Sequence, residues 1–234
     1  PVIIRPVSTR SEDKLGFKTK ICERDDFRSY TNSFVENGHH FLCQEYIPGN
    51  DNSVWFYLFV RSHSGKVLDV MGVKTLQSPP GNGIMAIGET QENPELMRIC
   101  RDFLSRIDYK GIGGLEFKYF NGKYYFIEMS IRIDGFISIS DSFLPLSLIA
   151  YEDAVGILDV AKYELTIRNV KYMDLRSTLS ARFSEHRYGE LFKDICQLFI
   201  CKYMQLNIFY KDNWKPFVYT FVLSVKHLFV NLFN

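Results

Sequence analysis

The pattern of apolar and polar positions is clearest at residues 115–129, where it predicts a β-hairpin. Two segments rich in aromatic and β-branched residues, Leu115–Tyr119 and Lys123–Met129, flank the pair Asn121-Gly122. Asn-Gly favours a type I′ turn, in which both central residues have positive φ. We therefore expect two antiparallel strands joined by a two-residue turn.

This hairpin carries one acidic residue on each strand, Glu116 and Glu128. A two-residue turn pairs Phe120 with Lys123, and therefore Glu116 with Ile127, one place away from Glu128. Because successive side chains alternate between faces, the two carboxylates converge only through a β-bulge, strand curvature or a longer loop. Converged carboxylates suit a divalent cation that holds a polyphosphate, since Mg²⁺ prefers oxygen ligands. A solvated surface hairpin is the alternative explanation of the same spacing.

Elsewhere the periodicity predicts further helices and strands. Helices are expected at residues 25–37, 94–107, 136–156, 185–203 and 217–233. Strands are expected at residues 1–6, 17–22, 41–47, 54–60, 66–74, 163–168 and 174–182.

Composition narrows the class of protein. Hydrophobic residues make up 46% and charged residues 24% of the chain, which is typical of a globular protein, and a net charge of +1 gives no electrostatic case for nucleic-acid binding. Five cysteines without a CxxC pair indicate reduced thiols and a cytoplasmic protein. No stretch reaches the roughly 18 uninterrupted apolar residues of a membrane-spanning helix. The chain starts directly on a strand-like segment, so we expect it to be part of a longer protein.

Two segments of the hairpin region, LEFK at 115–118 and YFIEMSIR at 125–132, resemble the metal-binding end of the ATP-grasp superfamily. In that family an acid on the first strand and a Glu on the second hold Mg²⁺ across the ATP phosphates, and an Asn two residues later completes the set. The resemblance therefore implies metal binding by Glu116, Glu128 and Ser130, with Ser130 at the position of the Asn.

A second segment, FLCQEYIPGND at residues 41–51, resembles the interdomain linker of the same superfamily. In those proteins the main chain of the linker binds the adenine edge, and a trailing acid binds the ribose hydroxyls. The resemblance implies that Gln44, Glu45 and Ile47 frame adenine and that Asp51 binds the ribose. Without the resemblance, the segment is a strand that ends in a Pro-Gly turn.

Weaker matches imply phosphate contacts. Arg5 stands where the family has a phosphate-binding lysine in a PVxxKP strand, and either Lys18 or Lys20, which alternate on the next expected strand, would face ATP. The loop at residues 7–16 would close over the phosphates. The resemblance further implies that Lys74 and Arg132 stabilise the transferred phosphate or an acylphosphate. Solvated side chains are the alternative explanation for Arg5, Lys20 and Lys74.

The resemblance implies an α+β fold with a small lobe at residues 1–48, a larger antiparallel sheet with helices at 49–160, and a C-terminal helical extension at 161–234. It implies an ATP-dependent ligase that joins a small-molecule carboxylate to an amine or thiol through an acylphosphate, with ATP and Mg²⁺ as cofactors. A catalytically degenerate nucleotide-binding or interaction module is the alternative, which Arg5 and Ser130 favour.

The apolar stripe along residues 217–233 carries few basic residues, whereas a helix that lies on a membrane surface carries many. We therefore expect this helix to pack on its own domain or on a second copy of the chain. Packing on a second copy would make the protein a homo-oligomer.

Overall fold

The computed structural model describes residues 1–7, 19–81, 83–163 and 169–233. The chain divides into two compact units, Pro1–Pro48 and Gly49–Asn234. The boundary expected after residue 48 coincides with this division, whereas the one expected after residue 160 has no counterpart in it. The expected phosphate loop beyond residue 7, Lys18 and the expected strand beyond residue 163 lie outside the described residues.

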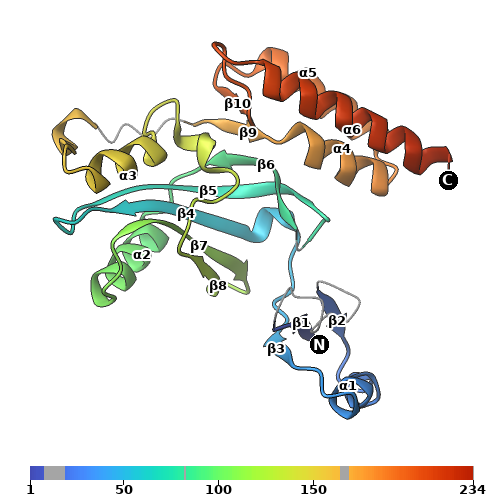
Figure 1. Ribbon diagram of the computed structural model, residues 1–234. Helices are drawn as coiled ribbons and strands as arrows, with labels where there is room; N and C mark the ends of the chain where they lie inside the picture. The colour runs from blue at the N-terminus through green and yellow to red at the C-terminus, as the bar shows by residue number, and fades with distance from the viewer. Residues whose placement is uncertain (8–18, 82, 164–168, 234) are drawn as a thin grey trace. The chain divides into compact units, whose positions relative to one another are not determined.

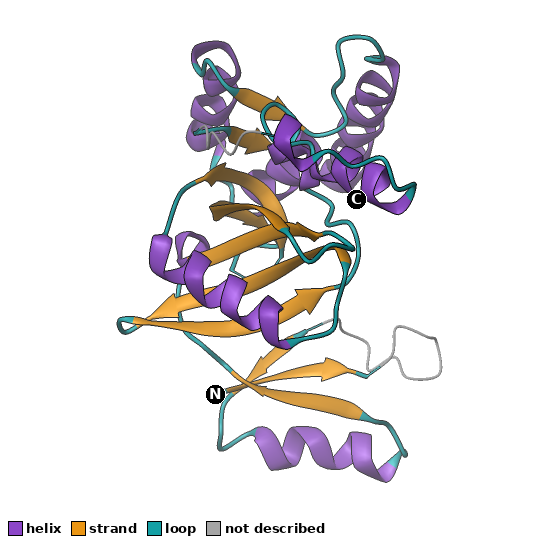
Figure 2. Cartoon of the chain, turned by 90° about the vertical axis from the view of Figure 1, so that its left-hand side faces the viewer, coloured by secondary structure: helices purple, strands orange, loops and turns teal. Residues whose placement is uncertain are grey.

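The Pro1–Pro48 unit is a three-stranded antiparallel sheet with one helix on it. The strand order is β2-β1-β3, and Figure 2 shows the helix lying along one face of the sheet. The elements are β1 (Val2–Pro6), β2 (Lys20–Cys22), α1 (Phe27–Glu36) and β3 (Phe41–Glu45). Ile4 and Cys22 form a small core with the aromatic residues of α1, and the helix predicted at residues 25–37 is confirmed.

The Gly49–Asn234 unit is built, in its described residues, on a seven-stranded sheet with the order β10-β9-β6-β5-β4-β7-β8 (Figure 1). All neighbouring strands are antiparallel except the parallel pair β9 and β10. The strands are β4 (Val54–Arg61), β5 (Val67–Ser78), β6 (Ile84–Thr90), β7 (Gly111–Phe120), β8 (Lys123–Ser130), β9 (Lys171–Met173) and β10 (Met204–Leu206). The predicted hairpin is confirmed as β7 and β8, and Asn121 and Gly122 have the φ values of 48° and 76° that a type I′ turn requires.

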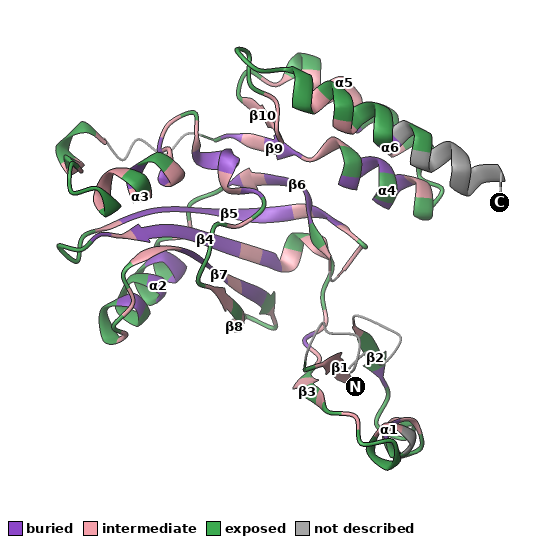
Figure 3. Cartoon of the chain, viewed as in Figure 1, coloured by how far each residue is buried: buried purple, intermediate pink, exposed green. Residues whose placement is uncertain are grey.

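The centre of this sheet is buried on both faces (Figure 3), so alternate residues of β4 enter two different cores. Tyr57 and Phe59 pack against the apolar side of the helix α2. Phe56 and Leu58 face the segment that follows β8 and includes the short turn η3 and the helix α3. These covering elements are α2 (Pro94–Arg106), η3 (Ile137–Ser140), α3 (Leu146–Ala154) and η4 (Val160–Lys162), and a further turn, η2 (Asp51–Ser53), precedes β4. The α+β class is confirmed.

Three helices lie beside the β9–β10 end of the sheet, α4 (Leu175–Ser184), α5 (Tyr188–Ile200) and α6 (Lys215–Phe233) (Figure 1). The strand predicted at residues 174–182 is wrong, because this stretch forms α4. The Asp174 side chain accepts a hydrogen bond from the backbone N–H of Ser177 at 2.7 Å and so starts a helix where the apolar alternation alone indicated a strand. The helices expected at 185–203 and 217–233 are confirmed. No helix in the described ranges combines the length and the apolar character that crossing a bilayer requires.

Candidate functional site

The β7–β8 hairpin brings Glu116 and Glu128 directly opposite each other. Near the turn the register follows the straight pairing, so that Phe117 lies opposite Phe126, but the next pair is Glu116 with Glu128. Ile127 is therefore the extra residue of a β-bulge, and the straight pairing of Glu116 with Ile127 is wrong. Directly opposed residues share a face of the sheet, so the bulge is what brings the two carboxylates together.

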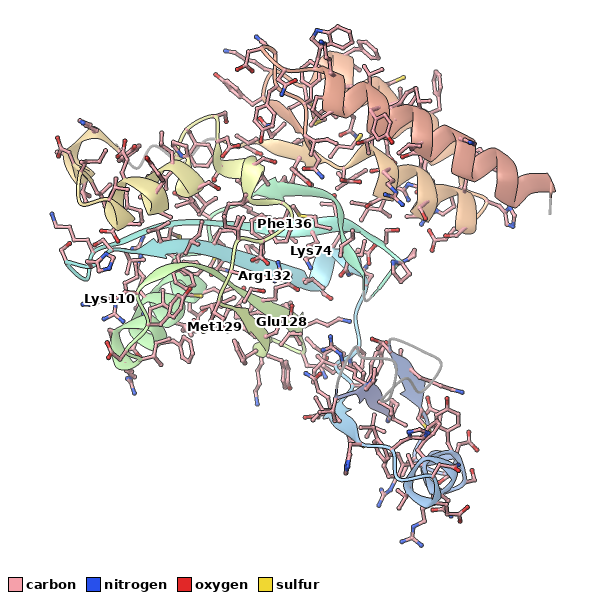
Figure 4. The ribbon with its side chains drawn as sticks, viewed as in Figure 1. Lys74, Lys110, Glu128, Met129, Arg132 and Phe136 are labelled. Atoms are coloured by element: carbon pink, nitrogen blue, oxygen red, sulfur yellow. The ribbon has the colours of Figure 1, made fainter. Side chains whose placement is uncertain are left out.

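Lys74 reaches the same place from β5. Its ammonium lies 2.7 Å from Glu116 Oε1, and its side chain is only 4% exposed. The ammonium also lies 5.7 Å from the centre of the Phe136 ring, which packs on the sheet after β8. Burial raises the pKa of Glu116, while the charge and hydrogen bond of Lys74 act in the opposite direction. Figure 4 shows Lys74, Phe136, Arg132 and Glu128 gathered in one region of the unit.

A third carboxylate, Asp134, belongs to this cluster and was not assigned from the sequence. Its side chain is 12% exposed and lies 4.0 Å from the guanidinium of Arg132. Its Oδ2 is 2.2 Å from the position that a Cβ on Gly114 would occupy, so the carboxylate occupies space that only a glycine leaves open. Burial raises the pKa of Asp134, a hydrogen bond from Ser130 and the charges of Arg132 and Lys74 oppose this, and Glu128 adds to it.

The arrangement of oxygen atoms fits a divalent cation that is shared with a phosphate ligand. Two opposed carboxylates and the Ser130 hydroxyl are hard oxygen donors, and Mg²⁺ commonly uses one or two protein carboxylates together with phosphate oxygens. Within the described ranges, no three or more acidic, imidazole or thiol side chains are grouped so that they could hold a metal. Phosphate or water oxygens would therefore have to complete the ligand set.

Asp51 has several partners inside its own unit. Its two oxygens accept hydrogen bonds from the backbone N–H of Gln77 at 2.8 Å, the Gln77 amide at 3.0 Å and the backbone N–H of Gly81 at 2.7 Å. These bonds fix the end of β5 and the turn that follows it. Ribose binding by Asp51 stays a prediction, and a ribose hydroxyl would have to share a carboxylate that already has three donors.

Lys118 is a second buried lysine, two residues beyond Glu116 on β7 and therefore on the same face of the sheet as Glu116. Burial lowers its pKa, and the nearby charge of Asp51 acts in the opposite direction. Its Cε lies 3.1 Å from the position that a Cβ on Gly49 would take, so the stem of the side chain packs against the start of this unit. The sequence motif contains Lys118, but nothing in the pattern showed that it would be buried beside Asp51.

The remaining residues assigned from the sequence lie in the Pro1–Pro48 unit, where they occupy two faces of the small sheet. Arg5 pairs with Leu42, and Gln44 pairs with Ile3, so Arg5 and Gln44 share the face that α1 does not cover. Lys20 pairs with the fully buried Ile4 and therefore lies on the α1 face. The structure does not place Arg5 and Lys20 on the same face.

Contacts of these residues follow from that placement. The ammonium of Lys20 lies 3.7 Å from the centre of the Tyr30 ring of α1, where a cation–π contact holds it. Glu45 ends β3 and is exposed, and Ile47, two residues further on, is buried. The nucleotide contacts assigned to Gln44, Glu45 and Ile47 stay predictions.

Comparison with known proteins gives biotin carboxylases among the relatives of this chain. The chain is 30% identical over 126 residues to the biotin carboxylase of Haemophilus influenzae, covering 53% of this chain and 24% of the relative. It is 31% identical over 104 residues to the biotin carboxylase of Pseudomonas aeruginosa, covering 44% of this chain and 21% of the relative. The chain thus spans about a quarter or less of the curated relatives that it matches. No family model matches it.

Solved structures share the fold at lower identity. A pyruvate carboxylase from Rhizobium etli superposes with a TM-score of 0.51 at 13% identity, covering 68% of this chain and 15% of that chain. An L-amino acid ligase from Bacillus licheniformis superposes with a TM-score of 0.50 at 17% identity, covering 73% of this chain and 45% of that chain. These relatives and the shared fold support the resemblance to the ATP-grasp superfamily that the hairpin and linker motifs indicated, over the part of those proteins that the chain spans.

Proposed function

We propose that this chain is the nucleotide-binding and metal-binding part of an ATP-dependent ligase. The reaction would join a carboxylate to an amine or thiol through an acylphosphate. The observation that carries the proposal is the bulge at Ile127, which places Glu116 opposite Glu128 on the face where Lys74 is buried.

In this proposal Glu116, Glu128 and Ser130 hold Mg²⁺. When bound, the ion would neutralise negative charge on the phosphates of the nucleotide. The protein contributes mainly by positioning the reactants and by stabilising charge, since phosphoryl transfer requires little covalent help from side chains.

Lys74 and Arg132 would stabilise the negative charge that is transferred. Lys74 is buried and already oriented by Glu116, so its ammonium is held in a place where water screens it little. Arg132 is 73% exposed, and its Nη1 donates to the carbonyl of Ile133 at 2.9 Å. Its planar guanidinium suits bidentate contact with a phosphate or carboxylate that arrives from solvent.

The nucleotide would be bound by Arg5 and Lys20 at its phosphates, and by Gln44, Glu45, Ile47 and Asp51 at adenine and ribose. Of these, Lys20 must leave the Tyr30 ring to reach a phosphate, which makes it the weakest member of the set. Arg5 lies on the uncovered face of its sheet and needs no such change.

Binding of Mg²⁺–ATP, measured by isothermal titration calorimetry, tests the proposal. The Glu116→Gln, Glu128→Gln double variant should lose most of the affinity seen with Mg²⁺ while it keeps its fold by circular dichroism. Equal Mg²⁺–ATP affinity in the double variant and the wild type would contradict the metal assignment.

The degenerate module is the second candidate, favoured by Ser130 at a position where the family pattern has Asn. Release of ADP and phosphate that depends on both a carboxylic acid and an amine would support the ligase. Nucleotide binding without acid-dependent turnover across a broad substrate panel would support the module instead.

A further inference from the structure

Ser130, Asp134 and Gly114 occupy one corner of the site. Ser130 lies directly opposite Gly114 in the β7–β8 pairing, so the side chain of Ser130 and the missing side chain of Gly114 point to the same face. The Asp134 carboxylate fills the place of that missing side chain, 2.2 Å from where its Cβ would be. The pairing therefore puts the carboxylate within reach of the Ser130 hydroxyl.

We propose that Ser130 and Asp134 work as a pair, in which Asp134 accepts the hydroxyl proton of Ser130 and leaves the lone pairs of Oγ free for a divalent cation at Glu116 and Glu128. The inference rests on the proposed function. Asp134 is a positioning residue here, because it acts on the cation through Ser130.

The chemistry of a hydroxyl explains why such a partner matters. A serine hydroxyl has one proton and two lone pairs, and its proton turns toward whatever acceptor is nearest. Without Asp134, Glu116 or Glu128 would attract that proton, and the hydroxyl would then compete with the cation for their oxygens. A carboxylate behind a ligand fixes the orientation of that ligand and makes its donor atom more basic.

An asparagine at position 130 would not depend on such a partner. Its carbonyl oxygen carries no proton and is an acceptor in every orientation of the amide plane. Asp134 should therefore matter in the protein with Ser130 and matter little in a Ser130→Asn background. If Asp134 acted only through its charge beside Arg132, or only by supporting the fold, its loss would weaken cation binding equally in the Ser130 protein and in the Ser130→Asn background.

The test measures Mn²⁺ affinity by electron paramagnetic resonance in the presence of a saturating non-hydrolysable ATP analogue. Asp134→Asn should weaken Mn²⁺ binding about tenfold in the Ser130 protein, as is usual for the loss of a carboxylate that supports a ligand. The double variant Ser130→Asn, Asp134→Asn should bind Mn²⁺ within about twofold of Ser130→Asn alone.

Two further variants complete the design. Asp153→Asn removes a carboxylate whose exposure, 10%, is close to the 12% of Asp134, but which pairs with His63 away from the site, so it should leave Mn²⁺ affinity unchanged. Gly114→Ala displaces the Asp134 carboxylate without removing its charge, and it provides the same comparison if Asp134→Asn does not fold.

The outcomes separate the inference from the proposed function. Equal losses from Asp134→Asn, or from Gly114→Ala, in the Ser130 protein and in the Ser130→Asn background would overturn the pairing and leave the proposed function standing. Absence of Mn²⁺–nucleotide binding by the wild-type chain would overturn the proposed function and the inference with it.

Discussion

Lys74 and Glu116 form an ion pair of 2.7 Å between Nζ and Oε1, with side chains only 4% and 19% exposed. The acid that we propose as a metal ligand is therefore already paired with a cation supplied by β5, on the other side of β4. Lys74 neutralises Glu116 in the absence of a ligand, and in the proposed function its ammonium would also stabilise charge on a bound phosphate. This pair gives the site a charge balance that either partner alone would lack.

Removal of Lys74 should show how far the stability of the fold depends on the ion pair with Glu116. Lys74→Met leaves the Glu116 carboxylate largely buried without its cation, and we expect the free energy of unfolding to fall by about 2 kcal/mol at pH 7. Adding Glu116→Gln should recover part of the loss, because the buried charge is then gone. Urea denaturation measures both values. Lys66→Met, an exposed lysine of the β4–β5 hairpin, is the control and should change stability by less than about 0.5 kcal/mol. Strictly additive losses at Lys74 and Glu116 would contradict the coupling.

Local signals predicted the hairpin well. Asn121-Gly122 and the flanking strand residues predicted the turn, and the choice of Glu116 and Glu128 as candidate metal ligands followed from the motif. The position of the bulge did not, because apolar alternation on β8 does not show which residue is the extra one. Ile127 becomes visible as the bulge only in the paired strands.

Asp134 and Lys118 were missed for a different reason. Asp134 enters the site only because Gly114, twenty residues earlier, has no side chain, and Lys118 becomes buried only where β7 meets Asp51. Both depend on contacts between segments distant in sequence. The strand wrongly expected at residues 174–182 is the converse case, since the capping role of Asp174 was a local signal that the alternation concealed.

Asp141, at the end of η3, should make stability depend on pH. Burial raises the pKa of its carboxyl. The native state therefore binds this proton more tightly than the unfolded chain, and its stability falls as pH rises from the ordinary carboxyl pKa of about 4 through the raised value. Asp141→Asn cannot ionise, so it should be more stable than the wild type at neutral pH and lose that advantage below a pH of about 4.

Urea denaturation of both proteins from acid to neutral pH checks this expectation. The exposed Asp212, in the turn before α6, supplies the control, and Asp212→Asn should give a small difference that stays constant across the range. An Asp141→Asn advantage that grows toward acid pH would reverse the sign and rule out burial as the cause.

The helix α6 should be held by one side only. It contacts α4, and the half-buried Phe217 ring lies 5.3 Å from the Phe209 ring, whereas Tyr219 is 67% exposed. Phe217→Ala should therefore lower the free energy of unfolding by about 2 kcal/mol, less than the cost in a fully buried core. Tyr219→Ala should change it by less than about 0.5 kcal/mol.

The outer side of α6 decides between the two expectations for this helix. Val222 and Leu223 are 57% and 46% exposed, so the side of α6 away from α4 presents apolar surface. If a second copy covers that surface, Val222→Asp with Leu223→Asp should shift the chain toward a monomer in analytical ultracentrifugation, with little change in circular dichroism. A wild-type chain that is already a monomer at all concentrations would refute the homo-oligomer and leave packing on α4 as the role of the helix.

Liposome flotation of the wild type should show no binding, because α6 carries few of the basic residues that hold a helix at a membrane surface. Clear flotation that the double variant loses would instead assign the exposed side to lipid.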